Sequence, residues 1–303
     1  MTAPHRFGFV ALMGPPNAGK STLMNQALGQ KVAIVTPKPQ TTRNRITGIL
    51  TRPDAQLVFV DTPGVHRLRG KMNRLLLEAA WDALDQADAV CLLVDGSLAD
   101  SRPDRFDQEM APLTKALAEC RKPLFVAVNK ADRLGDKRRL LPVIQRCAAA
   151  WPGAEIVPVS ALTGENVDRL LELLIRALPE SPAMFPEDQL STAPMRFLAA
   201  EVIREKLFLD LRQELPYQTA VEIEVYEETE TGVNIAAVIF VARENHKGMV
   251  IGKGGSRLKA VGTQARLELA DMLETRVHLE LYVKVREDWT EDLGFLRELG
   301  LGQ

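Results

Sequence analysis

Eight residues near the start of the chain combine glycine, lysine and serine at a spacing that suits phosphate chemistry. They follow an apolar run, residues 7–13, and read Gly14-Pro15-Pro16-Asn17-Ala18-Gly19-Lys20-Ser21. Glycines let backbone N–H groups turn inward around a phosphate, the lysine neutralises β- and γ-phosphates, and the serine hydroxyl ligates Mg²⁺. A helix pattern that includes Thr22 follows and adds its positive N-terminal end. The stretch predicts a nucleoside triphosphate site of undetermined base; a chance glycine turn is the alternative.

A second group of polar residues follows the apolar run at residues 57–60 and reads Asp61-Thr62-Pro63-Gly64. A carboxylate that leaves a buried strand beside the phosphate loop can hold Mg²⁺ directly or through water. The Gly64 N–H can face the γ-phosphate. Taken alone, these four residues are equally compatible with a plain Asp-x-Pro-Gly turn.

The choice of base is indicated by Asn129-Lys130-Ala131-Asp132, which follows the apolar run at residues 124–128. The Asp132 carboxylate can accept hydrogen bonds from N1–H and N2–H₂ of guanine, whereas adenine has no such pair of donors. The Lys130 stem can lie over the base, and Asn129 can tie this loop to the phosphate strand. A solvated turn of mixed charge is the alternative. A weaker group, which offers backbone N–H groups to the base oxygen, is Ser160-Ala161-Leu162.

The segment at residues 31–45 is long, polar and rich in proline and threonine, which suggests a mobile loop. A threonine in it that completes the Mg²⁺ shell only when a γ-phosphate is present would make the loop a switch. The chemistry of the sequence does not choose between Thr41 and Thr42.

These candidate residues need elements that bring them together, and the first part of the chain has such a pattern. Apolar runs alternate with helical patterns: the runs are at 7–13, 57–60, 90–94, 124–128 and 156–159, and the helices near 20–28, 71–86, 104–119, 137–150 and 166–178. The alternation predicts an α/β fold with a doubly wound, mostly parallel sheet covered on both faces. Ligands on such sheets bind beyond the carboxyl ends of the strands, where the candidate residues follow.

Composition and length bound the class of protein. The 303 residues suggest two domains, and a hydrophobic content of 46% is ordinary for a globular protein. No run approaches the ~18 apolar residues of a membrane span, and the first eight residues form no signal region. The three cysteines, Cys91, Cys120 and Cys147, have neither a metal-binding spacing nor a disulfide framework. We therefore expect a cytoplasmic protein without an integral membrane segment.

A proline-rich linker, residues 179–195, is expected between a first domain at residues 1–178 and a second at residues 196–303. The second domain has helical patterns at 197–211 and before its last strand, and strand patterns at 219–226, 234–242 and 277–285. The order α-β-β-α-α-β predicts an α+β domain, which a C-terminal tail follows.

Glycine also marks the second domain, in a segment that contains Ile251, Gly252, Lys253, Gly254, Gly255, Arg257 and Lys259. Glycines at a helix–helix junction permit the close approach of a nucleic-acid backbone, and helix N-termini face phosphate. The charge is mixed: residues 195–303 hold 14 basic and 19 acidic residues, net −5, whereas residues 243–259 have a local net charge of +4. The segment predicts RNA binding; a glycine helix cap with solvated lysines is the alternative.

In order and spacing, the groups of the first domain resemble the five motifs of small GTP-binding proteins. The resemblance implies a P-loop GTPase that binds GTP, GDP and Mg²⁺, with Ser21, Thr42 and Asp61 at the metal and with Lys20, Thr42 and Gly64 in catalysis. Thr42 is favoured over Thr41 because the switch threonine of similar bacterial GTPases directly precedes an arginine.

Three residues affect the expected rate of hydrolysis. Val65 stands where Ras-like proteins carry a glutamine that orients the attacking water, so we expect slow intrinsic hydrolysis or a different water-positioning group. His66 is a candidate for that role, although a lone histidine is more often a surface or packing residue. Asn17 stands where potassium-activated GTPases of similar sequence carry an ion ligand, so K⁺ is a further candidate cofactor; shaping the loop is the alternative role.

The second domain resembles a type II KH domain, and a GTPase domain followed by a KH domain resembles the Era family over nearly the whole chain, including residues 214–217 and the Trp289 region. The resemblance implies a GTP-dependent factor in small ribosomal subunit assembly that binds near the 3′ end of the small-subunit ribosomal RNA. We expect a monomer. Peripheral association with the inner membrane is a further family property.

Other functions remain as alternatives. The first is a GTP-dependent switch that binds another cellular RNA or has a cell-cycle or membrane-linked role. A metabolic kinase or ATPase is disfavoured by residues 129–132. An RNA-binding module with a dead nucleotide site is disfavoured by the intact Lys20, Ser21 and Asp61.

Overall fold

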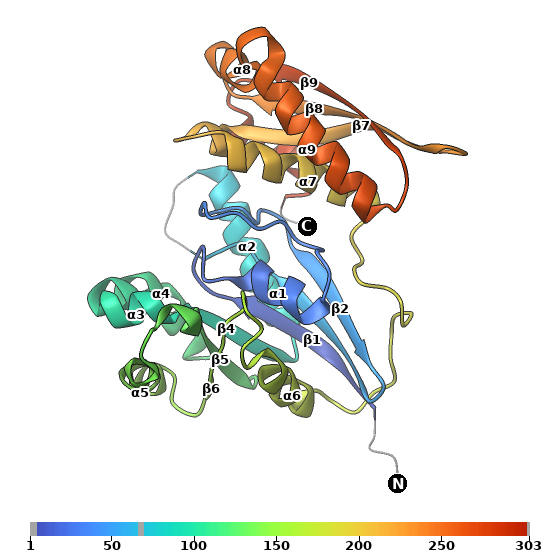
Figure 1. The fold of residues 1–303 in the computed structure, drawn as a ribbon. Helices are drawn as coiled ribbons and strands as arrows, with labels where there is room; N and C mark the ends of the chain where they lie inside the picture. Colours follow the sequence, from blue (N-terminus) through green and yellow to red (C-terminus); the bar gives the residue numbers. More distant parts are fainter. Residues whose placement is uncertain (1–4, 66–69, 302–303) are drawn as a thin grey trace. The chain divides into compact units, whose positions relative to one another are not determined.

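The computed structural model describes residues 5–65 and 70–301. The chain divides into two compact units, of which the first ends at Thr192 and the second begins at Ala193; the short segment Gly70–Arg74 groups with the second. Each unit has its own sheet (Figure 1). Among the helices of the described residues, none has both the length and the apolar character needed to cross a bilayer.

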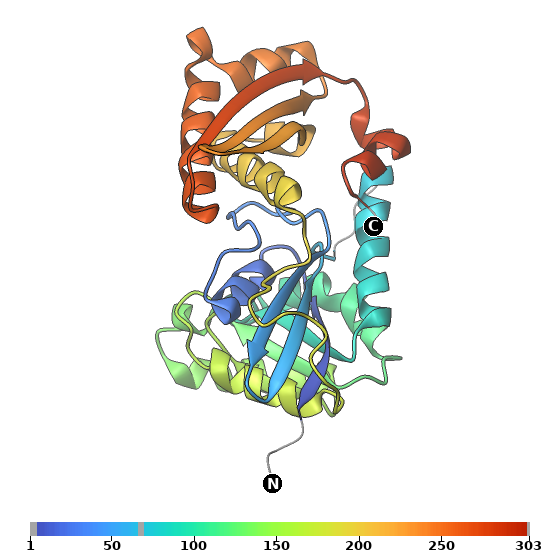
Figure 2. The ribbon, with the colours of Figure 1, turned by 90° about the vertical axis from the view of Figure 1, so that its right-hand side faces the viewer.

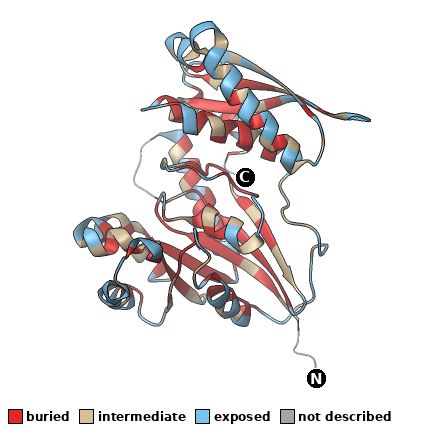
Figure 3. Ribbon diagram, in the orientation of Figure 1, coloured by how far each residue is buried: buried red, intermediate tan, exposed pale blue. Residues whose placement is uncertain are grey.

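The first unit is built on a six-stranded sheet in the order β2-β3-β1-β4-β5-β6. All neighbouring strands are parallel except β2, which pairs antiparallel with β3. The strands are β1 (Arg6–Met13), β2 (Ile46–Arg52), β3 (Ala55–Asp61), β4 (Ala89–Asp95), β5 (Leu124–Asn129) and β6 (Glu155–Pro158). The strands β1, β3, β4 and β5 are buried along most of their length, which is why the sequence reads as continuous apolar runs there (Figure 3).

Helices cover both faces of this sheet. On one face, α1 and α6 contact each other and the strands β1 to β3. On the other, apolar side chains of α2, α4 and α5 join those of the strands in one core. The helices are α1 (Lys20–Leu28), α2 (Lys71–Gln86), α3 (Gly96–Ser101), α4 (Pro103–Leu117), α5 (Leu140–Ala150) and α6 (Val167–Ala177). The predicted doubly wound, mostly parallel fold is confirmed; the edge strand β2 and the short helix α3 were not predicted.

The segment expected as a linker is bound to the first unit as far as Thr192. The fully buried amide of Gln56 accepts hydrogen bonds from the N–H groups of Met184 and Phe185, both at 2.9 Å, and donates to the Phe185 carbonyl. Further along, the Ile49 N–H donates to the Leu190 carbonyl at 2.8 Å. These hydrogen bonds hold the segment as a strap against the strands β2 and β3.

The second unit has a three-stranded sheet in the order β7-β8-β9, with β7 and β8 antiparallel and β8 and β9 parallel. Helices α7 and α9 pack against it around one apolar core (Figure 2). The elements are α7 (Met195–Asp210), β7 (Thr219–Thr229), β8 (Gly232–Val241), α8 (Glu244–Ile251), α9 (Ser256–Met272), β9 (Val277–Val285) and α10 (Leu293–Glu298). The predicted order α-β-β-α-α-β is confirmed.

A C-terminal segment packs on the other face of this sheet. Phe240 faces away from the main core, because its neighbours Ile239 and Val241 face into it. Its ring meets that of Phe295 edge to face at 4.9 Å, and Trp289 is fully buried beside them. The helix α10, which the sequence did not predict, is held by these aromatic contacts.

Candidate functional site

The phosphate loop joins β1 to α1 in a conformation that needs glycine at two positions. Gly14 has φ 151°, and a Cβ there would lie 2.6 Å from the Leu93 carbonyl oxygen. Gly19 has φ 101°, and its Cβ would lie 2.2 Å from Nδ2 of Asn129. Both the positive φ and the close neighbours exclude a side chain. The loop is therefore held in shape by the strand ends around it.

Lys20 is the first residue of α1 and is only 6% exposed. Its ammonium donates to the carbonyl oxygens of Gly14 and Pro15, each at 3.1 Å, so it lies across the loop. Burial lowers the pKa of Lys20 to about 8, although the Asp61 carboxylate acts in the opposite direction. A buried cation at this position is placed to neutralise phosphate charge.

Three oxygen-bearing side chains meet beside the lysine and could hold a metal ion. The Ser21 hydroxyl donates to Oδ2 of Asp61 at 2.5 Å and lies 2.9 Å from the Thr42 hydroxyl. Oδ1 of Asp61 is buried and, among the described residues, has no hydrogen-bond partner. Two hydroxyls and a carboxylate are hard oxygen donors, the kind that Mg²⁺ prefers, and the unpaired Oδ1 fits a water in its shell. The residues present therefore fit Mg²⁺.

Burial at this site destabilises the charged form of the Asp61 carboxyl. Burial raises the pKa of its carboxyl to about 6, against the opposing effects of the Lys20 ammonium and of hydrogen bonds from Ser21, Thr62 and Thr42. A nearby divalent cation would favour the charged form.

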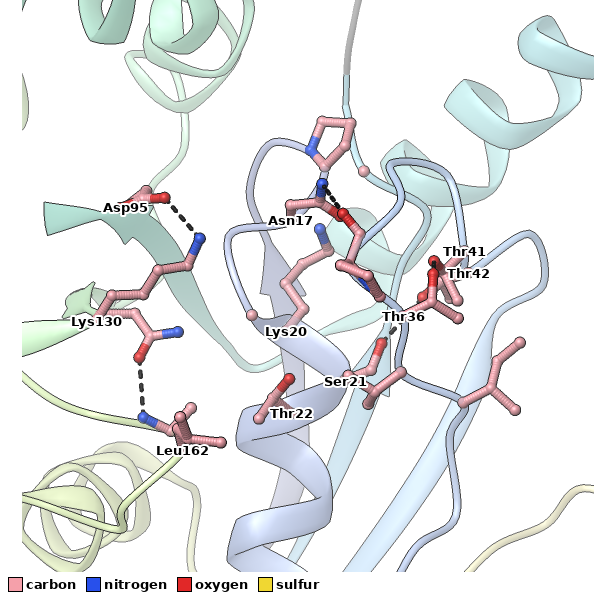
Figure 4. Close-up of a pocket in the computed structure, with 18 of the residues that line it drawn as sticks. Asn17, Lys20, Ser21, Thr22, Thr36, Thr41, Thr42, Asp95, Lys130 and Leu162 are labelled. Carbon is pink, nitrogen blue, oxygen red and sulfur yellow. Dashed lines mark hydrogen bonds and ion pairs between the residues drawn. The ribbon is translucent and has the colours of Figure 1, made fainter. Parts of the chain in front are cut away.

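The two threonines of the loop at residues 31–45 face different partners (Figure 4). Thr42 points to Ser21, as described above. The Thr41 hydroxyl instead lies 2.6 Å from that of Thr36 and donates to the Lys38 carbonyl at 2.8 Å, which closes a small loop within the segment. The structure therefore brings Thr42, and not Thr41, to the metal-binding oxygens.

The segment after β3 passes close to the phosphate loop. A Cβ on Gly64 would lie 2.6 Å from the backbone nitrogen of Pro16, and the Thr62 hydroxyl donates to the Leu12 carbonyl at 2.7 Å. Val65 is 2% exposed and belongs to the apolar core, so its side chain is packed away from water. The other candidate for positioning the water, His66, lies outside the described residues.

Asn129 links three of the predicted groups. Its Nδ2 donates to the carbonyl of Ala18 in the phosphate loop at 2.7 Å, and its Oδ1 accepts from the Ala161 N–H at 2.9 Å. Asp132 is exposed, and the Ser160 hydroxyl donates to one of its oxygens at 2.6 Å. The bond from Ser160 orients the Asp132 carboxylate, and Leu162, 72% exposed, completes this end of the site.

A cavity of about 540 Å³ unites these groups. Predicted residues that line it are Pro16, Asn17, Gly19, Lys20, Ser21, Thr22, Thr42, Gly64, Asn129, Lys130, Asp132, Ala161 and Leu162. Gly14, Pro15, Ala18, Asp61, Thr62, Pro63 and Ser160 are not among its lining residues. Sequence reasoning missed the apolar wall of Ile34 and Val35, and it missed Asp95, whose only signal was its place at the end of an apolar run.

The glycine loop of the second unit joins α8 to α9. Gly252, Gly254 and Gly255 have φ of 75°, 59° and 77°, and a Cβ on either of the last two would meet nothing within 4 Å. Lys253 and Lys259 are exposed. Arg257 is bound within the unit, because it pairs with Asp210 at 2.9 Å and donates to the Met249 carbonyl at 2.6 Å. Ile251, at the end of α8, is only partly exposed.

A groove of about 340 Å³ lies beside this loop, between α9 and β9. Its lining combines leucine, glycine and basic residues with one threonine: Gly255, Leu258, Lys259, Gly262, Thr263, Arg266, Leu279 and Leu281. A basic, partly apolar groove suits an extended strand whose bases stack and whose backbone is anionic.

Comparisons with known proteins match both units. A family model described as 50S ribosome-binding GTPase matches residues 9–130, and a KH domain model matches residues 214–290. GTPase Era of Nitratidesulfovibrio vulgaris (strain DP4) is 57% identical over 299 residues, which cover 98% of this chain and 97% of that protein.

Solved structures agree over the full length. Era in complex with MgGDPNP and nucleotides 1506–1542 of 16S ribosomal RNA is 38% identical, with a TM-score of 0.91 and coverage of 99% of this chain and 100% of that chain. A variant of Aquifex aeolicus Era bound to GDP·AlF4⁻ is also 38% identical, with a TM-score of 0.90 and coverage of 98% and 100%. With relatives this similar along its whole length, the chain belongs to the Era family of GTPases and is an enzyme that hydrolyses GTP.

Proposed function

We propose that the chain binds small-subunit ribosomal RNA near its 3′ end in a GTP-dependent manner and assists small ribosomal subunit assembly. The observation that carries the proposal is the open glycine loop with its basic groove, in a chain that also has the cavity lined by Lys20, Ser21 and Asp132. The relative solved with nucleotides 1506–1542 of 16S ribosomal RNA supports the choice of RNA.

The residues of the nucleotide site take the following roles in the proposal. Lys20 and the loop N–H groups stabilise the charge that develops on the transferred phosphoryl group, and the Gly64 N–H faces its oxygen atoms. Ser21, Thr42 and Asp61 would hold Mg²⁺, which would neutralise charge on phosphate oxygens. Because the Val65 side chain has no hydrogen-bonding group and is buried in the apolar core, the attacking water is positioned by other groups. GTP to GDP conversion then resets the RNA-binding state.

We propose that the chain acts as a monomer in the cytoplasm.

Crosslinking to total cellular RNA, followed by sequencing, tests the choice of RNA. We expect reads concentrated near the 3′ end of the small-subunit ribosomal RNA with GTP, and fewer of them with GDP. Reads spread over other transcripts would favour a switch that acts on another RNA. Equal recovery with both nucleotides would contradict control by GTP.

The variant Asp132→Asn tests the placement of the base. Its side chain presents one acceptor and one donor, so the donor meets the N–H groups of guanine, whereas xanthine has a carbonyl in place of the 2-amino group. We expect GTP affinity to fall by about 10² and the affinity for xanthosine triphosphate to rise. An unchanged preference for GTP would show that residues 129–132 form an ordinary turn.

A further inference from the structure

Asp95 and Lys130 form an ion pair in the wall of the nucleotide cavity that the roles above leave unused. Asp95 is the last residue of β4 and the register partner of Asn129, the last residue of β5. Lys130 comes directly after Asn129 and therefore lies next to Asp95. The Lys130 ammonium donates to Oδ2 of Asp95 at 2.6 Å, and each side chain is 19% exposed (Figure 4). Both residues line the cavity.

The carboxylate of Asp95 is itself fixed. Its second oxygen, Oδ1, accepts hydrogen bonds from the Ser97 hydroxyl at 2.6 Å and from the Leu98 N–H at 3.1 Å, at the start of α3. Burial raises the pKa of Asp95, but the bonds from Lys130 and Ser97 outweigh it and hold the pKa below its ordinary value. Asp95 therefore presents a charged, immobile acceptor to Lys130.

The backbone around the pair is equally constrained. Lys130 has φ 65°, in the left-handed region that costs energy for a residue with a side chain. A Cβ on Gly96 would lie 2.9 Å from Val128 and 3.0 Å from the Asn129 carbonyl oxygen, so the two strand ends stay in close contact. An otherwise flexible lysine stem is thus held along the cavity wall at both ends.

We propose that Asp95 is a positioning residue for the guanine base: by binding the Lys130 ammonium, it holds the lysine stem against one face of the base. A lysine fixed before binding loses less conformational entropy when the nucleotide enters, and this raises affinity. Asp132 selects the base by pairing with its edge, whereas Asp95 acts on the face of the base through the stem of Lys130. Loss of Asp95 therefore lowers the affinity of every nucleotide that enters the pocket by the same factor. The inference rests on the proposed placement of the base, which Asp132→Asn tests separately.

The variant Asp95→Ser separates this role from the helix cap. Serine is a good N-cap residue, so the bond to Leu98 is kept, but its side chain is too short to reach Lys130. We expect the dissociation constants of GTP, GDP and inosine triphosphate to rise together, by roughly 5- to 30-fold, with kcat at saturating GTP changed at most about twofold. The matched control is Asp100→Ser, which removes the ion pair between α3 and Arg139 and should leave all constants unchanged.

A double-mutant cycle makes the pairing itself measurable. Lys130→Met keeps an apolar stem without the ammonium, and we expect it to weaken binding as Asp95→Ser does. The double variant should bind no more weakly than either single variant, because both remove the same interaction. If Asp95→Ser folds poorly, as a thermal melt would show, Asp95→Asn keeps both the cap and the shape and replaces it in the cycle.

Two results would overturn the inference. One is additive losses in the double variant, because they would mean that Asp95 and Lys130 act independently. The other is unchanged affinity for all three nucleotides in the Asp95 variant. If either occurred while Asp132→Asn still switched the base, the placement of the base would stand and only the role of Asp95 would fall.

Discussion

Two glycine loops precede helices in this chain, and they differ in what surrounds them. In the phosphate loop, a Cβ on Gly14 or Gly19 would lie 2.6 Å or 2.2 Å from neighbouring atoms. In the second loop, a Cβ on Gly254 or Gly255 would meet open space. In the first loop both close packing and positive φ require glycine, whereas positive φ alone requires it at the last two positions of the second loop.

The difference separates two ways of binding phosphate. The first loop is held within a set of buried groups that includes Lys20 and Asp61, so its shape is settled before a small ligand enters. The second loop presents an exposed lysine and a shallow groove, which a long polymer can approach from outside. A buried site should respond strongly to small changes of shape, and an exposed site to changes of charge.

The variants Gly19→Ala and Gly254→Ala compare the loops most directly, and the first should have the largest effect. An added methyl at Gly19 displaces Asn129, which then loses its bonds to Ala18 and Ala161. The loss of those buried bonds, together with the strain of φ 101°, should lower GDP affinity by about 10²–10³. Gly254→Ala should cost only about 1 kcal/mol of stability and leave GDP affinity unchanged. Fluorescent-nucleotide titration and thermal melts measure both, and equal losses would show that close packing is irrelevant.

Charge reversal in the second loop should have the next largest effect. Lys253→Asp with Gly254→Asp places two carboxylates where a phosphate backbone approaches, so RNA affinity should fall by roughly 30- to 100-fold with GTP binding intact. The matched control is Lys115→Asp with Gly153→Asp, because Gly153 also has a positive φ, 84°, and open space around its Cβ position. RNA affinity that is unchanged in the first pair, or equally reduced in the control, would contradict the KH site.

The pH dependence of the free energy of unfolding should show how much the buried carboxylate of Asp61 destabilises the folded chain. Burial raises the pKa of Asp61 to about 6, from 3.8, so between pH 4 and 6 the folded chain holds a proton that the unfolded chain has released. In that window the nucleotide-free protein should lose stability as pH rises, by on the order of 1–3 kcal/mol.

Asp61→Asn should flatten this profile and be more stable than the natural chain at pH 7, while losing the tightening of GTP binding by Mg²⁺. Urea unfolding at pH 4.5 and 7 measures the effect. Lys253→Met, which changes only the exposed loop, should keep the natural profile. A lower stability of Asp61→Asn at pH 7 would mean that the attraction to Lys20 and the charge-assisted bond from Ser21 outweigh the burial of charge.

The features that sequence reasoning predicted are those with a local signature. The helix expected at residues 71–86 and the strand at 277–285 have those bounds in the structure, because apolar periodicity records which face is buried. The features it missed depend on distant partners. The strand β2 exists through its pairing with β3, Gln56 holds the strap through contacts more than a hundred residues away, and Asp210 binds Arg257 from another helix.

The same distinction applies within the nucleotide site. The octet at residues 14–21 and the segment at 129–132 could be recognised because their residues are consecutive. The choice between Thr41 and Thr42 could not be made from chemistry alone, because both carry the same hydroxyl and only the path of the backbone separates them. Asp95 had no motif, since its partner Lys130 follows a different strand, β5.

The smallest expected effect concerns K⁺ and Asn17, the exposed residue of the phosphate loop. Asn17 has φ 61°, and its Nδ2 donates to the Pro37 carbonyl at 3.1 Å, which leaves the amide oxygen for a cation. A K⁺ ion beside the phosphates adds positive charge near the transition state. Since the position is exposed, we expect GTP turnover to be only about tenfold faster in K⁺ than in Na⁺ at equal ionic strength.

The variant Asn17→Gly separates an ion ligand from a residue that only shapes the loop, because glycine keeps the positive φ and removes the amide. If Asn17 is a ligand, the variant should turn over GTP equally in both salts. If Asn17 only shapes the loop, the preference for K⁺ should survive. Asn166→Gly is the matched control: Asn166 also has a positive φ, 59°, and its Nδ2 donates to a proline carbonyl, that of Pro158 at 2.9 Å, yet it does not line the nucleotide cavity. Loss of the K⁺ preference in Asn17→Gly alone would show that the exposed Asn17 amide binds K⁺. The site would then have a second cation beside the buried ammonium of Lys20.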